Sequence, residues 1–194
     1  MYFPITVIDD FYNNFSLVKN YLQLLNFKKK THYSTPGFET DLISNLNPDF
    51  FKQCVSKIMS IYYERVHSFN KLGWECRTKF EKIVPYGKDY DQEGWIHHDD
   101  TNKLTGILFI EGDYGEGTSF FKKKHLGMPN IVNHQIKEKL FAGHHVDPKI
   151  YNKLLKEYNN NFEEILNVPC IPNRLVLFDS SILHRANGYG TLEK

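Results

Sequence analysis

The sequence contains few cysteines, and they follow no pattern. Its three cysteines in 194 residues, Cys54, Cys76 and Cys170, are widely spaced and form no CxxC pair. Disulfide-stabilised secreted domains and zinc ribbons depend on many or closely spaced cysteines. The sequence therefore favours neither of these classes, and we expect a reduced, cytoplasmic setting.

Neither a charge excess nor a long apolar run is present. Lys and Arg number 24 against 23 Asp and Glu, giving a net charge of +1, and basic and aromatic residues do not interleave as in nucleic-acid-binding proteins. No apolar run reaches the roughly 18 residues of a membrane span, and the N-terminus lacks the basic and apolar regions of a signal peptide. We expect a soluble, non-secreted protein without nucleic-acid or membrane partners.

Motifs of several large enzyme classes are also missing. We find no nucleophile elbow, no phosphate-binding loop and no dinucleotide fingerprint. The length fits a single domain, which at this size buries roughly 70% of the surface of its unfolded chain. We predict one domain over 1–194, with a strand and supporting helices over 1–72 and a sheet-rich core over 73–194, interrupted by an insertion at about 123–168.

The period of the apolar residues changes along the chain. Helical spacing predicts helices near residues 14–27 and from Asn47 and Pro48 onward, the latter two acting as N-cap and first helical residue. From residue 73 the period becomes two, which predicts antiparallel strands. These strands are expected within residues 73–85, 104–121 and 174–188, with a further helix over about 148–166. The pattern predicts a mainly antiparallel α+β fold whose sheet curls into a sandwich or barrel.

The run GWIHHDD carries the most informative chemistry. It contains HxD in two registers, His97 with Asp99 or His98 with Asp100, and residues two apart on a strand share one face. His184 ends an apolar strand and supplies a possible third ligand. Two histidines and one carboxylate leave three positions open on a metal ion, as in non-haem Fe(II) oxygenases. The alternative is that these side chains are ordinary hydrogen-bonded residues.

We favour the register of His97 and Asp99. In that register Trp95 shares their inward face, whereas His98 and Asp100 point outward, where their polar groups stay hydrated. A separate cluster, formed by His144, His145 and Asp147, is interpreted as a surface loop.

The motifs resemble a known family when taken in order. The segments WIHHDD, LTGILFI, GEGTSFF and NRLVLFDSSILHRANG, spread over residues 73–194, resemble the catalytic half of 2-oxoglutarate and Fe(II)-dependent dioxygenases, nearest to the prolyl-4-hydroxylase-like branch. The resemblance implies a double-stranded β-helix, or jelly roll, braced by N-terminal helices. It also implies Fe(II), 2-oxoglutarate and O2, with release of succinate and CO2 as a peptidyl or free amino-acid side chain is hydroxylated.

The same resemblance implies residues for the site. The iron ligands fall on His97, Asp99 and His184, and a basic residue about ten positions after the last His binds the far carboxylate of 2-oxoglutarate. That position is Lys194, with no strand beyond it, which departs from the family pattern. Either Lys194 serves, or the chain runs on and its closing strand is missing, or another basic residue substitutes. The substitutes are Arg77, Lys82 and Arg185, although an outward Arg185 in a surface ion pair is the simpler interpretation.

Several neighbouring residues have two interpretations each. Asp179 either caps a turn or orients His184, and Thr118 and Ser119 either contact the cosubstrate or belong to a turn. Three aromatic residues near the motif either line a substrate pocket or cover the sheet: Tyr86, Tyr90 and Trp95.

Two rival functions remain open. One is a non-catalytic, cupin-like or jelly-roll module that binds a metal or another ligand. The other is a metal-dependent hydrolase, which would need more carboxylates than the later strands provide. The partner is predicted to be a small-molecule or peptide substrate, and the sequence does not indicate an oligomeric state.

Overall fold

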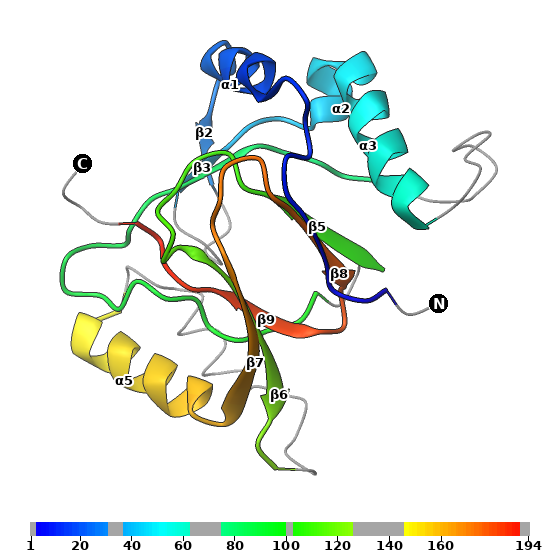
Figure 1. The fold of residues 1–194 in the computed structure, drawn as a ribbon. Helices are drawn as coiled ribbons and strands as arrows, with labels where there is room; N and C mark the ends of the chain where they lie inside the picture. The colour runs from blue at the N-terminus through cyan, green and yellow to red at the C-terminus, as the bar shows by residue number, and fades with distance from the viewer. Residues whose placement is uncertain (1–2, 31–36, 63–74, 100–102, 126–145, 191–194) are drawn as a thin grey trace.

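The computed structural model describes residues 3–30, 37–62, 75–99, 103–125 and 146–190, and all its strand pairs are antiparallel (Figure 1). The helices are α1 (Phe15–Gln23), α2 (Ile43–Leu46), α3 (Pro48–Tyr62) and α5 (Pro148–Asn159). The strands are β1 (Thr6–Ile8), β2 (Lys28–Lys29), β3 (Gly37–Glu39), β4 (Glu81–Ile83), β5 (Leu104–Leu108), β6 (Gly117–Lys123), β7 (Phe162–Pro169), β8 (Leu175–Asp179) and β9 (Leu183–Ala186). The predicted α+β fold with mainly antiparallel strands is confirmed.

Two three-stranded sheets form the centre of the molecule. The first has the strand order β1-β8-β5, and the second has the order β7-β6-β9. Alternate residues of β8 point to opposite faces, so Val176 and Phe178 face the second sheet. There Phe178 packs edge-on against Phe120 of β6, with ring centroids 5.0 Å apart. The two sheets therefore form a sandwich with a shared apolar interior.

The N-terminal helices brace the outer face of the first sheet. Leu175 and Leu177 of β8 point away from the second sheet and pack with Ile58 of α3. The start of α3 is capped as predicted, because the Asn47 side chain accepts a hydrogen bond of 3.0 Å from the amide of Phe50. The apolar stripe of this helix thus contributes to the core.

The strand predicted over 73–85 is mostly wrong. Residues 73 and 74 lie outside the described residues, and within 75–85 only Glu81–Ile83 forms a strand, β4, which belongs to a third sheet with the order β2-β3-β4. Residues 75–80 carry no regular strand, and five of these six side chains are exposed or half-buried. Alternation of apolar and polar residues alone did not decide the structure: the carbonyls of Thr78 and Phe80 accept from backbone amides, but no continuous strand pairing extends through 75–80.

The helix and the insertion predicted around residue 160 need correction. The helix ends at Asn159, and Phe162–Pro169 forms β7, which pairs with the whole length of β6. Part of the predicted insertion at 123–168 is therefore a strand of the second sheet. Thr118 and Ser119 likewise lie within β6, buried, and not in a turn. Among the described helices, none has the length and apolar character needed to cross a membrane.

Candidate metal centre

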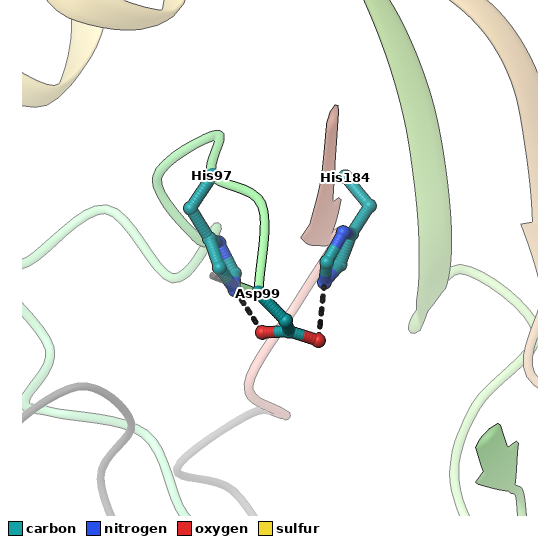
Figure 2. Close-up of side chains that lie close together, drawn as sticks. All are labelled: His97, Asp99 and His184. Atoms are coloured by element: carbon teal, nitrogen blue, oxygen red, sulfur yellow. Dashed lines mark ion pairs between the residues drawn. The ribbon is translucent and has the colours of Figure 1, made fainter. Parts of the chain in front are cut away.

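Three side chains predicted from the sequence meet at the β9 edge of the second sheet. His97, Asp99 and His184 each offer one ligand atom, and these atoms lie within 4.8 Å of one another. Figure 2 shows the Asp99 carboxylate between the two imidazoles, with Nε2 of His97 3.9 Å from Oδ1 and Nε2 of His184 3.9 Å from Oδ2. The spacing leaves room for an ion between the three groups.

Backbone pairing explains why the two histidines face each other. His97 and His184 form an antiparallel bridge in which each amide donates to the other's carbonyl, at 3.0 and 2.8 Å. The same segment bonds to the chain around β9 at both ends, through Gly94 to Ala186 and through Asp99 to Ser180. Residues 94–99 therefore run along the free edge of β9, which fixes the register of the motif.

Each imidazole is held by its own local carbonyl. Nδ1 of His97 lies 3.0 Å from the carbonyl of Trp95, and Nδ1 of His184 lies 2.8 Å from that of Ile182. Because a carbonyl only accepts, Nδ1 carries the proton and Nε2 keeps its lone pair directed at Asp99. Burial, together with neighbouring His97, lowers the pKa of His184 to about 4. This imidazole is therefore neutral at pH 7, as a metal ligand must be.

Two residues not identified from the sequence support the carboxylate, Thr105 directly and Ser180 through Thr105. The hydroxyl of Thr105, on β5, donates to Oδ2 of Asp99 at 2.6 Å. That hydroxyl also lies 2.8 Å from the hydroxyl of Ser180, which is fully buried after β8. Only a polar residue in the otherwise apolar stretch LTGIL hinted at this contact.

Aromatic rings flank both imidazoles. Trp95 stacks on His97, with centroids 5.1 Å apart and planes at 24°, while Phe178 contacts His184 edge-on at 4.7 Å. Trp95 is buried against α5, and Tyr86 and Tyr90 pack on the same cluster. Between the two interpretations of these residues, the contacts favour covering of the sheet by aromatic packing.

The basic candidates lie away from the three ligand atoms or outside the described residues. The exposed Arg77 pairs with Glu75 at 2.7 Å. Arg185 follows His184 on β9 and so points to the opposite face of the sheet, where it pairs with Glu93 and its guanidinium lies 5.2 Å from the centre of the Phe121 ring. Lys194 lies outside the described residues.

The other candidates are accounted for as follows. His98 is half-buried and is not part of the group of ligand atoms, while Asp100, His144 and His145 lie outside the described residues. Asp147 caps α5 by accepting from the amides of Lys149 and Ile150.

Asp179 stabilises the turn that follows β8. One carboxylate oxygen accepts from both the amide and the hydroxyl of Ser181, at 3.0 and 2.6 Å, and these bonds lower the Asp179 pKa. The other oxygen accepts from the amide of Phe3 at 3.3 Å. The contacts therefore match the turn-capping interpretation.

Comparison with known proteins gives a family and a fold. Residues 2–187 match the model of a family of unknown function, DUF6445, so the chain belongs to that family. No curated protein matches it. Among solved structures it is similar to HygX from Streptomyces hygroscopicus with nickel and 2-oxoglutarate bound, with a TM-score of 0.54 and 10% identity over 97% of this chain and 78% of that one. At this identity the similarity shows a shared fold.

Proposed function

We propose that this protein is an Fe(II)- and 2-oxoglutarate-dependent dioxygenase in which His97, Asp99 and His184 hold the iron. The observation that carries the proposal is the convergence of two imidazole Nε2 atoms and one carboxylate within 4.8 Å. The similarity to HygX, a protein solved with nickel and 2-oxoglutarate bound, supports it. The metal, 2-oxoglutarate and O2 supply the oxidising power, with succinate and CO2 as co-products.

The donor set suits iron better than a structural zinc. Structural zinc sites are closed by four ligands, commonly with thiolates. Among the described residues this cluster has three members and no cysteine. Two nitrogen donors and one carboxylate leave three coordination positions open, enough for a bidentate cosubstrate and oxygen.

The chain's own contribution is orientation of the ligands. Carbonyl partners at Nδ1 hold both imidazoles in the tautomer that presents Nε2. The bond from Thr105 occupies one lone pair of Asp99 and restricts rotation of its carboxylate. Trp95 and Phe178 shield the rings from water on their packed faces.

The finer features of the proposal rest on the sequence resemblance. We propose that the two central sheets and the segment 94–99 form a double-stranded β-helix of the prolyl-4-hydroxylase-like type, and that the substrate is a peptidyl or free amino-acid side chain. For the far carboxylate of 2-oxoglutarate we retain Lys194, because Arg77 and Arg185 already have acidic partners.

Conversion of 2-oxoglutarate to succinate tests the activity. Purified protein is incubated with Fe(II), ascorbate and 2-oxoglutarate under air, and succinate is followed by NMR. We expect slow, substrate-independent succinate formation by the wild type and none above background in His184→Ala.

A matched pair of variants tests the register. His97→Ala should abolish succinate formation, whereas His98→Ala should retain it, because His98 is not part of the group of ligand atoms. Activity that survives in His184→Ala, or that is lost only in His98→Ala, would contradict the assignment.

A thermal-shift series separates the enzyme from a non-catalytic module. Mn(II) binds oxygen and nitrogen ligands without supporting turnover, so it reports on binding alone. The enzyme is expected to gain stability from Mn(II) and gain more when 2-oxoglutarate or N-oxalylglycine is added. A metal-binding module gains from Mn(II) only, and that result would favour the rival function.

A further inference from the structure

Side chains of α5 bind the backbone of the motif on the edge opposite β9. The Asn159 side chain accepts from the amide of Ile96 and donates to the carbonyl of Gly94, both at 3.1 Å. The Tyr158 hydroxyl donates to the carbonyl of Ile96 at 2.9 Å. Since the amide and carbonyl of His97 point the other way, to His184, this segment is bonded along both of its edges.

The bonds to Ile96 satisfy groups that water cannot reach. Ile96 is fully buried, and an unpaired backbone amide or carbonyl in such a place is costly. In a sheet the next strand supplies the missing partners, and here two side chains at the end of a helix take that place. The peptide immediately before His97 is therefore positioned by α5.

The helix is attached along the whole segment and not only at its end. Asn152 lies seven residues before Asn159, on the same face of α5, and it accepts from the amide of Asp91 at 2.8 Å and donates to the carbonyl of Asp89 at 3.0 Å. Tyr151, together with Leu155, packs against Trp95 between these two contacts. The helix therefore holds residues 89–96 by hydrogen bonds near both ends of the segment and by packing between them.

We propose that Asn159, assisted by Tyr158, is a positioning residue of the metal centre. Asn159 fixes the amide of Ile96 and Tyr158 fixes its carbonyl, and together these bonds set the position of the His97 imidazole relative to His184 and Asp99. Neither residue belongs to the three-residue group of ligand atoms, so each acts through its bonds to the backbone, and Tyr158 also packs against Trp95. The inference rests on the proposed metal-binding function.

A Co(II) titration followed by visible absorption tests the role. The spectrum reports ligand geometry, and the titration gives the dissociation constant without any need for turnover. Outer partners of metal ligands typically contribute 10- to 100-fold to affinity, so Asn159→Ala is expected to weaken Co(II) binding about 10-fold and to change the spectrum. Tyr158→Phe, which removes one hydroxyl, should have a smaller effect in the same direction.

Asn160→Ala provides the matched control. Asn160 is the next residue, and its side chain is exposed. Its backbone amide donates to the carbonyl of Lys156, whereas its side-chain amide has no hydrogen bond to the described residues. This variant should keep the affinity and spectrum of the wild type. Asn159→Asp keeps the acceptor for Ile96 but loses the donor to Gly94, so an intermediate affinity is expected.

Hydrogen exchange of the metal-free protein gives an independent readout. The amides of Ile96 and His97 should exchange faster in Asn159→Ala than in Asn160→Ala, at protein stabilities matched with urea. If Asn159→Ala only lowers global stability, and its folded form binds Co(II) with unchanged affinity and spectrum, the inference is wrong.

A failure of the proposed metal-binding function can be distinguished from a failure of this inference. A wild-type protein that binds no Co(II) would refute the proposed function and, with it, this inference. Should Asn159→Ala fail to fold, Tyr158→Phe decides, because loss of one hydroxyl retains the packing of the ring.

Discussion

The hydroxyl of Thr105 donates a 2.6 Å hydrogen bond to Oδ2 of Asp99, which links the first sheet to the candidate metal centre. Asp99 itself lies on the segment that pairs with β9, and its amide donates to the carbonyl of Ser180. The carboxylate is therefore held from both central sheets, so its orientation depends on how the sandwich packs.

Replacement of Thr105 by Val tests this contact. Valine matches the shape of threonine but cannot donate, so the carboxylate loses one restraint and we expect metal affinity to fall by about 10- to 100-fold. Thr105→Ser retains the hydroxyl and should stay close to the wild type. The measurement is a Mn(II) titration, and equal affinity for Thr105→Val and the wild type would contradict the role.

Close approach of Gly94 to β9 gives a second prediction. A Cβ at Gly94 would lie 3.1 Å from the backbone nitrogen and oxygen of Ala186, and equally close to the Tyr189 hydroxyl. Over-packing of this kind costs about 1–3 kcal/mol, so Gly94→Ala should lower the free energy of unfolding by that amount.

Gly115 is the control for this variant. A Cβ there meets nothing within 4 Å, so Gly115→Ala should change the free energy of unfolding by less than about 0.5 kcal/mol. Urea denaturation monitored by circular dichroism measures both. Similar values for the two variants would show that the 94–99 segment adapts to a side chain.

Metal binding should stabilise the folded chain. An ion that binds only the native state adds about 2.7 kcal/mol to the free energy of unfolding at 100 times its dissociation constant. We expect this gain with Mn(II) in urea denaturation and its loss on adding EDTA. Asp99→Ala should show no gain, and a full gain in that variant would place the ion elsewhere.

Trp95 joins the ligand segment to α5. It is 7% exposed, stacks on His97 and packs with Leu155. Removing a buried Trp leaves a large cavity, so Trp95→Ala is expected to lower the free energy of unfolding by about 3–5 kcal/mol. Trp95→Phe keeps an aromatic face against His97 and should cost less, as measured by the same denaturation. Equal losses in the two variants would mean that ring stacking contributes little.

The three ligand candidates could be found from the sequence because their signal is local. HxD on an extended segment presents two side chains on one face, and a histidine that ends an apolar strand is conspicuous. The order of the flanking apolar segments along the chain linked the HxD motif to His184. The structure brings His97, Asp99 and His184 together, whereas the preference for this register over His98 and Asp100 stays a prediction as far as metal binding is concerned.

Strand β7 was not predicted, because its formation depends on pairing with a distant strand and not on the local sequence. Residues 162–166, FEEIL, were predicted as the end of a helix because apolar and polar residues do not alternate there as in a half-buried strand. In the structure most side chains of β7 are exposed, so burial left no strand pattern in the sequence. What makes it a strand is pairing with β6, including an ion pair of 3.2 Å between Glu163 and Lys122. Strand preference depends on such cross-strand neighbours more than on the residue itself.

The sequence by itself determined the helical stripes of α1 and α3, the cap at Asn47 and the candidate ligands His97, Asp99 and His184, since the helices, the cap and the HxD pair each depend on residues near one another in the chain. Only the tertiary structure decided the partners of those side chains. Thr105 reaches Asp99 from another sheet, and Asn159 reaches Ile96 across 63 positions of the chain. Such contacts are fixed by how sheets and helices pack, which no local pattern specifies.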